Sequence, residues 1–171
     1  KNKKITLIET FFFNSLFRKK IFDERYHRNI YKKFPEKIKK KCYFFPINLS
    51  IFSIKKFLKV VKRGSLKFIH PLDFLKFADY KKAIFFNFYL NKPGNSPIKY
   101  ENYEINNILN YYKFISNFNF SSFLAYINFF FLKRLEENKI KIDLIIDWYE
   151  NQLIDKGLVL GKNTFYPNTK L

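Results

Sequence analysis

The chain has 171 residues, enough for about one domain, and its 47% hydrophobic content can form a packed core, which excludes an intrinsically disordered protein. Its formal net charge of +19 comes from 33 Lys and Arg against 14 Asp and Glu. An excess of this size favours an anionic partner, such as nucleic acid or a lipid surface. The chain is also rich in residues that A/T-rich codons encode, and we favour this compositional origin of the charge over selection for nucleic-acid binding.

Several other classes are excluded by residues that the sequence lacks. Cys42 is the only cysteine, so there is no disulfide framework and no zinc pattern. The two histidines, His27 and His70, give no metal site, and no cofactor-binding motif is present. No uncharged apolar stretch reaches the roughly 18 residues that a membrane-spanning helix needs. We therefore expect a cytoplasmic protein, with peripheral membrane contact left open.

The N-terminal part of the chain begins with a basic, aromatic segment, residues 5–33, for which we expect a loop and a helix. The apolar run 42–45, followed by Pro46, predicts a buried strand. Apolar residues then recur at helical spacing and predict a helix that ends at Gly64. Its apolar stripe is formed by Ile54, Phe57, Leu58 and Val61.

The next segments predict a short strand at 67–70 and a helix that begins near Pro71, because proline suits the first turn of a helix. Three side chains of this helix are expected to face the core: Phe74, Phe77 and Ala78. A loop is predicted at 92–97, where proline, glycine, asparagine and serine are concentrated. Helical spacing then resumes near Glu104 and predicts an inward stripe formed by Ile105, Ile108, Leu109 and Tyr112.

A second helix is predicted from about Ser121, and a buried strand at 142–146. The inward residues of this helix are expected to be Leu124, Ile127, Phe131 and Leu135. We interpret Gly157 and Gly161 as a helix C-cap followed by a turn. Alternating strands and helices predict an α/β domain with an open, mainly parallel sheet and flanking helices.

The most informative segment is 142–156, in which a strand, a carboxylate and a helix start follow one another. Ligands of open α/β sheets bind at such strand ends. Spacings of three and four predict that four polar side chains share one helix face: Asp147, Glu150, Asn151 and Asp155. A carboxylate there can act as a base or bind a sugar hydroxyl, and Trp148 can stack on a sugar ring. The alternative is structural, with Asp147 as an N-cap and Glu150 as its capping-box partner.

Residues 147–157 read DWYENQLIDKG, and residues 165–170 read FYPNTK. Together with looser likenesses at 31–46 and 73–80, these segments resemble bacterial surface-carbohydrate biosynthesis proteins of a glycosyltransferase-like kind. The resemblance spans about 22–171 and is specific almost only at 147–156. It implies a GT-B-like protein with two facing Rossmann-like halves. Residues 22–171 would be one domain of the first half, truncated at its C-terminus, and 1–21 a cut N-terminal edge, so we expect a fragment of a longer protein.

The resemblance also implies an activity, namely transfer of a sugar from a nucleotide donor to a glycan or glycolipid acceptor during capsule or lipopolysaccharide assembly at the inner membrane. The predicted catalytic residues are Asp147 and Glu150. The predicted substrate-binding residues are Trp148, Asn151, Gln152 and Asp155. The donor is expected to bind mostly outside this chain, so the fragment alone would be inactive, and no metal or resident cofactor is predicted.

Two other functions stay open at this point. The first is a basic nucleic-acid-binding module, although nucleic acid is the less favoured partner, and the second is a non-catalytic interaction domain. An anionic membrane surface is a further expected partner because of the positive charge.

Overall fold

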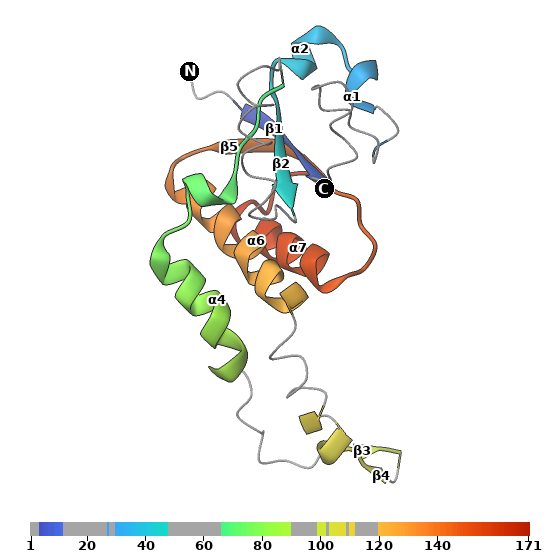
Figure 1. Cartoon of the computed structure of the whole chain (residues 1–171). Coiled ribbons are helices and arrows are strands. Elements are labelled where there is room, and N and C mark those ends of the chain that lie inside the picture. The colour runs from blue at the N-terminus through green and yellow to red at the C-terminus, as the bar shows by residue number, and fades with distance from the viewer. Residues whose placement is uncertain are drawn as a thin grey trace.

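The centre of the structure is an open sheet of three parallel strands in the order β2-β1-β5 (Figure 1). The strands are β1 (Lys4–Phe11), β2 (Cys42–Ile47) and β5 (Lys141–Ile146). The computed structural model describes residues 4–11, 27, 30–47, 66–89, 99–101, 103–108, 110–111 and 120–171. The helix predicted to end at Gly64 and the loop predicted at 92–97 lie outside these residues.

Single parallel bridges extend this sheet at both edges. Phe44 of β2 pairs with Phe68, and Leu144 of β5 pairs with Lys170. Numbered along the chain, these segments lie in the order 3-2-1-4-5, as in a Rossmann-like sheet. The predicted α/β class with an open, parallel, Rossmann-like sheet is therefore confirmed. The strand order reverses between β1 and β5, so the topological switch point lies between these two strands.

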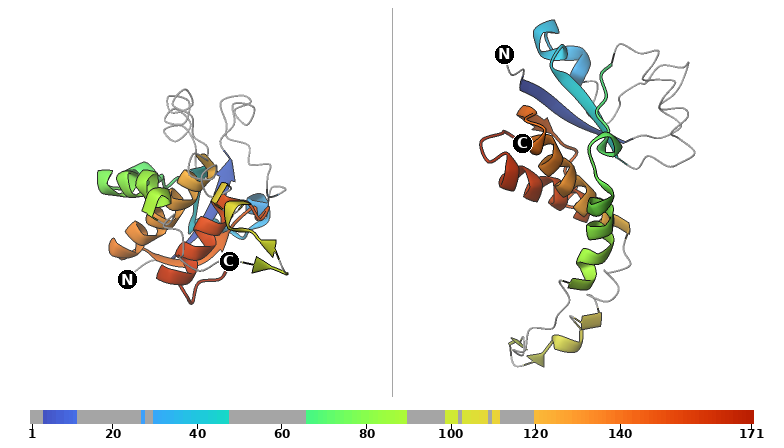
Figure 2. Two further views of the ribbon diagram at one scale, coloured as in Figure 1. Left: turned by 90° about the horizontal axis from the view of Figure 1, so that it is seen from below. Right: turned by 90° about the vertical axis from the view of Figure 1, so that its left-hand side faces the viewer.

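Helices cover both faces of the sheet, because successive side chains of a strand point to opposite faces. On one face, Leu7 and Phe45 belong to the main core, which packs against α6 (Phe120–Glu137) and α7 (Leu153–Phe165). The right-hand view of Figure 2 shows these two helices side by side below the sheet.

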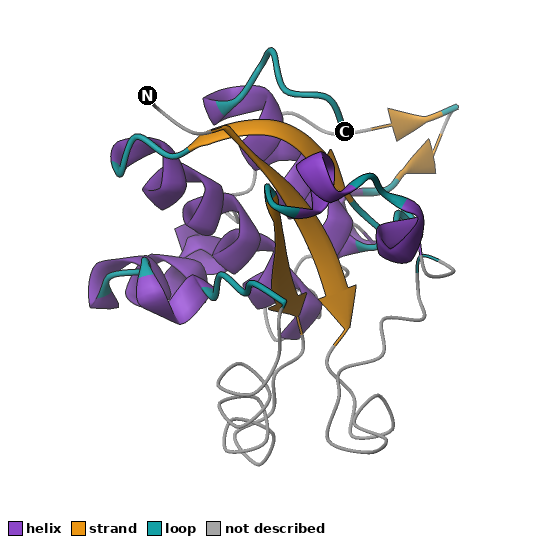
Figure 3. Cartoon of the chain, turned by 90° about the horizontal axis from the view of Figure 1, so that it is seen from above, coloured by secondary structure: helices purple, strands orange, loops and turns teal. Residues whose placement is uncertain are grey.

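The opposite face carries a smaller cluster. Its fully buried members are Ile8, Cys42 and Phe44. Tyr31 of α1 (Ile30–Lys33) and Ile38 of α2 (Glu36–Lys39) pack against them. Figure 3 shows the parallel strands of the central sheet between flanking helices, which is the layered arrangement of a doubly wound domain.

The packing of α6 on α7 depends on two glycines. Gly157 and Gly161 lie inside α7, so the prediction of a C-cap and a turn is wrong. A Cβ atom at Gly157 would lie 2.0 Å from the backbone oxygen of Ala125, and one at Gly161 would lie 3.1 Å from a methyl carbon of Leu132. The glycines are needed because the two helices approach closely at these positions.

The segment for which a loop and a helix were expected, residues 5–33, contains the central strand of the sheet. That expectation is therefore wrong for β1, and a domain that starts at residue 22 leaves this strand out. β1 lies between β2 and β5, and its side chains from Ile5 to Thr10 are buried on both faces of the sheet. The buried side chains include the polar residues Thr6, Glu9 and Thr10. These polar residues interrupt the apolar run that would have predicted a strand.

The region after Pro71 is only partly as predicted. Pro71 begins a helical turn, but this is the short 3-10 helix η3 (Pro71–Asp73), and α4 (Phe77–Tyr89) follows separately. Phe77 is 84% exposed and Ala78 is also exposed, so their predicted inward positions are wrong. The buried residues of α4 include Asp79, which pairs with Arg134 of α6 at 2.7 Å and therefore sets which face of α4 lies inward.

Several other predictions that fall on the described residues are confirmed. β2, α6 and β5 occur where strands and a helix were predicted, and Ile127, Phe131 and Leu135 are buried as expected. Residues 106–108 and 110–111 are helical, but Ile108 is exposed rather than inward. Just before them, β3 (Lys99–Tyr100) and β4 (Tyr103–Glu104) form a small antiparallel pair.

Candidate functional site

Two carboxylates meet at the switch point. β1 and β5 pair Ile8 with Ile146, so the next residues along these strands, Glu9 and Asp147, lie beside one another at the carboxyl ends. Both follow the alternation that places Leu7 in the core on the α6 and α7 side of the sheet. Asp147 thus lies at the strand end where it was predicted, and its partner comes from the opposite end of the chain.

The third carboxylate, Asp155, belongs to the start of α7. Its Oδ2 accepts hydrogen bonds from the backbone N–H groups of Glu150, at 2.9 Å, and Gln152, at 2.8 Å. Gln152 is the N-cap residue of α7, which begins at Leu153. Asp155 therefore connects the loop at 147–152 to the first turn of the helix.

These contacts correct two expectations. Residues 147–152 form an irregular loop rather than a helix, and Asn151 has a positive φ of 59°, so Asp147, Glu150, Asn151 and Asp155 do not share one helix face. The alternative capping box formed by Asp147 and Glu150 is also absent, because Gln152 is the N-cap and Asp155 bonds to its backbone.

The Glu9, Asp147 and Asp155 side chains form a buried acidic cluster, in which one oxygen of each lies within 4.8 Å of the others. Glu9 is only 1% exposed. Burial, a hydrogen bond with Asp147 and the charges of Asp147 and Asp155 together raise the pKa of Glu9 to about 10, although the Trp148 backbone N–H opposes the shift. Glu9 is therefore protonated at neutral pH.

The proton on Glu9 explains an otherwise unfavourable arrangement. Among the described residues, no well-formed hydrogen bond reaches the buried carboxylate oxygens of Glu9 and Asp147, so ionising both side chains would be unfavourable. A protonated Glu9 can donate a hydrogen bond to Asp147. The Glu9 proton would then be shared between the ends of two neighbouring strands.

The same oxygens are of the type that hard divalent cations bind. Metal binding requires deprotonated ligands, so a cation at this cluster would have to displace the proton that the raised pKa of Glu9 retains. Oδ2 of Asp155 is also already bonded to two backbone N–H groups. We therefore favour the proton-sharing pair over a metal site at this cluster.

The remaining predicted site residues lie together on the exposed loop above the cluster. The Trp148 ring nitrogen donates to Glu150 at 2.6 Å, and the side-chain amide of Gln152 donates to the other oxygen of Glu150 at 2.7 Å. Trp148 is 37% exposed. Asn151 accepts a hydrogen bond from the Tyr149 hydroxyl at 3.3 Å. The predicted set is therefore divided between this loop and the buried cluster.

Two residues of the site were not predicted from the sequence. Glu9 completes the acidic cluster, and its backbone oxygen lies 2.9 Å from Nε2 of His27. The His27 ring meets the Trp148 ring edge-on, with centroids 6.0 Å apart. His27 therefore links the end of β1 to Trp148. An acid within the apolar segment ITLIETF was the signal that could have identified Glu9 as a buried carboxyl.

No protein-family model matches the chain, and no curated protein or solved structure matches it significantly. Within the part of the chain that the structure describes, every helix is too short or too polar to cross a membrane. The function of the site is therefore inferred from its own side chains and from its place in the sheet.

Proposed function

We propose that this chain supplies the sugar-binding and proton-accepting part of a glycosyltransferase-like protein that acts in surface polysaccharide assembly. The observation that carries the proposal is the exposed loop at the switch point, where an aromatic ring, a carboxylate and a carboxamide are joined by hydrogen bonds. The resemblance of residues 147–157 to surface-carbohydrate biosynthesis proteins supports it. The net charge of +19 supports binding to an anionic membrane that carries the acceptor.

The loop has the chemistry that sugar recognition requires. The exposed ring of Trp148 offers an apolar surface to the face of a sugar ring, while Asn151 and Gln152 can donate to and accept from hydroxyl groups. Glu150 is exposed and oriented by its two side-chain donors, so it can accept a proton. It would take the proton of the acceptor hydroxyl as that oxygen bonds to the anomeric carbon and the bond to the nucleotide phosphate breaks.

The buried cluster has a different role in this proposal. The carboxylate oxygens of Asp147 are buried, so they position the loop rather than contact the sugar. Asp155 accepts a hydrogen bond from the Glu150 backbone N–H and so holds the loop against the first turn of α7. Of the two carboxylates predicted to be catalytic, Glu150 is thus the proposed base and Asp147 a positioning residue.

The proposal is tested by measuring sugar transfer in the full-length protein, with a panel of nucleotide-sugars and membrane glycolipid acceptors. Glu150→Gln keeps an oxygen that accepts from Trp148 but removes the base. We expect kcat to fall by about 10²-fold to 10⁴-fold with little change in KM. The matched control is Glu136→Gln, which changes an exposed carboxylate of α6 and should leave kcat unchanged.

The outcomes separate the possible roles of the loop. Unchanged kcat in Glu150→Gln would show that this carboxylate is not the base. A fall in kcat for Glu150→Gln and Glu136→Gln alike would indicate a general loss of stability, which circular dichroism would detect. Absence of transfer with every donor would remove the glycosyltransferase proposal itself.

A further inference from the structure

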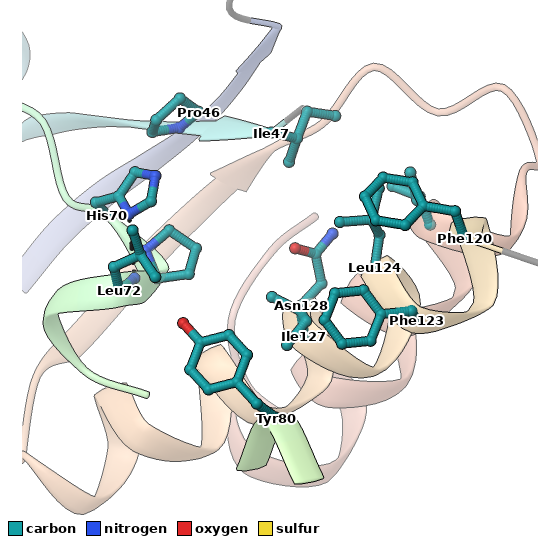
Figure 4. Close-up of a pocket in the computed structure, with 12 residues that line it drawn as sticks. Pro46, Ile47, His70, Leu72, Tyr80, Phe120, Phe123, Leu124, Ile127 and Asn128 are labelled. Carbon is teal, nitrogen blue, oxygen red and sulfur yellow. Dashed lines mark hydrogen bonds between the residues drawn. The ribbon is translucent and has the colours of Figure 1, made fainter. Parts of the chain in front are cut away.

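A half-open cavity of about 200 Å³ lies at the carboxyl end of β2, next to the proposed sugar site (Figure 4). Its walls come from β2, η3, α4, α6 and the first turn of α7. They are mostly apolar and include Ile47, Leu72, Phe123 and Ile154. Ile154 follows the loop at 147–152 within two residues, so the first turn of α7 connects the loop of the proposed sugar site to the wall of the cavity.

Two polar groups line this apolar cavity without a partner. Asn128 is 3% exposed, and its Nδ2 has no hydrogen-bond acceptor among the described residues. The Tyr80 hydroxyl is likewise buried and unpaired within that part of the chain. Figure 4 shows both side chains directed toward the cavity, from α6 and α4. Burial, together with the charge of Asp79, raises the pKa of Tyr80, so its hydroxyl keeps its proton and can donate.

The combination of apolar walls and unpaired polar atoms limits the chemical class of ligand that the cavity can bind. A hydrocarbon chain would leave Asn128 and Tyr80 unpaired, which is unfavourable for buried polar groups. A hexose carries hydroxyl groups around its whole ring, and the apolar walls could not pair them. A heteroaromatic base has apolar faces and polar atoms only at its edge, so it satisfies both requirements.

The aromatic side chains at the cavity support a flat ligand. Phe120 and Phe123 both line it, and their rings are nearly parallel, at an interplanar angle of 25° with centroids 5.9 Å apart. Nucleobases stack on aromatic side chains of this kind whatever their sequence identity. The cavity lies at the carboxyl edge of the sheet, where ligands bind in open α/β folds, and β2 is next to β1, which forms one side of the switch point.

We propose that this cavity binds the base of a nucleotide, with Asn128 and Tyr80 hydrogen-bonding to the edge of the base. The inference rests on the proposed function, in which the nucleotide belongs to the sugar donor. It places base recognition on this chain, whereas the resemblance places the donor mostly on the other half of the protein. The donor would then lie across the carboxyl edge of the sheet, with its base in the cavity and its sugar toward Trp148.

The test is equilibrium dialysis of the protein with UMP, CMP, AMP and GMP, and with ribose 5-phosphate as a control that lacks a base. Asn128→Leu and Tyr80→Phe each remove one hydrogen bond to the base, so we expect about tenfold weaker binding of the preferred nucleotide in each variant. Tyr126→Phe changes a tyrosine of α6 outside the cavity and should bind like the wild type.

Thermal unfolding without ligand provides the second readout. If the two polar groups have hydrogen-bond partners only when a ligand is bound, removing them should not lower the stability of the free protein. Asn128→Leu and Tyr80→Phe should then unfold at temperatures no lower than the wild type. Clearly lower unfolding temperatures would assign both groups a structural role and overturn the proposal. So would ribose 5-phosphate binding as tightly as the nucleotides, or the absence of binding by all four.

The result also separates this inference from the proposed function. Nucleotide binding that depends on the base, in a protein that does not transfer sugar, would support the base-binding cavity and rule out the proposed glycosyltransferase activity. Sugar transfer with a KM for the donor that is unchanged in Asn128→Leu would keep the transferase and overturn the cavity assignment.

Discussion

Replacement of Glu9 by glutamine tests whether the buried pair at the switch point shares a proton. The pKa of Glu9 is raised from 4.5 to about 10, so between these values the folded protein holds a proton that the unfolded chain releases. The stabilisation that the bound proton contributes is fully present below pH 4.5, and it is lost as the pH rises toward the pKa of Glu9 in the folded protein. The free energy of unfolding should therefore fall by about 1.4 kcal/mol for each pH unit in this range.

Glutamine has nearly the same shape and donates to Asp147 through its amide, but it cannot titrate. Glu9→Gln should therefore lack this contribution to the pH dependence. Between about pH 6 and about pH 8, the stability of the variant relative to the wild type should rise by about 3 kcal/mol. Groups that titrate in both proteins cancel in this difference.

Urea denaturation followed by circular dichroism, at several pH values across this range, measures the effect. Glu136→Gln, at an exposed position of α6, should follow the wild-type pH dependence and serves as the matched control. Parallel pH profiles for Glu9→Gln and the wild type would refute the proton-sharing pair. They would mean that Glu9 is ionised in the folded protein.

Two further predictions concern the packing of α6. Gly157→Ala should destabilise the protein by about 3 kcal/mol, because the new methyl group would overlap the Ala125 backbone at 2.0 Å. Gly161→Ala should cost about 1 kcal/mol, because its new methyl group would lie 3.1 Å from a Leu132 methyl and 3.2 Å from the Phe129 Cα, a much milder overlap. Similar urea midpoints for the two variants would contradict the close helix contact. Asp79→Asn should cost about 2 kcal/mol, because Arg134, whose side chain is 12% exposed, would lose the charged oxygens of Asp79 and keep only Glu137 as its carboxylate partner among the described residues. The cost should be much smaller in an Arg134→Met background, and an equal cost in both backgrounds would show that the ion pair is not its cause.

The sequence predicts the elements whose apolar residues follow one simple period. α6 carries its inward residues at helical spacing, and β5 is an apolar run interrupted only by Asp143, so both were identified. β1 was not identified, because Thr6, Glu9 and Thr10 divide its apolar residues and leave no such run. Gly157 and Gly161 were assigned to a turn because a close helix contact is a tertiary feature that local spacing cannot reveal.

The site was predicted in part for the same reason. Asp147 and Asp155 were found because they follow a recognisable strand and lie close together in the sequence. Glu9 was not, because it becomes their neighbour only when β1 pairs with β5 across the switch point. The positive φ of Asn151 and the N-cap at Gln152 delay the start of α7, and this places Glu150 on an exposed loop instead of a helix face.

The fluorescence of Trp148 gives the most direct test of the proposed sugar site, because this residue is the only tryptophan in the chain and lies in the loop itself. Titration with candidate acceptor sugars should produce a saturable change in its emission. Gln152→Ala should weaken that change, because it removes both an amide that can bind sugar hydroxyls and a donor to Glu150. Emission that does not respond to any acceptor sugar, in a protein that transfers sugar, would contradict the placement of the sugar site at this loop.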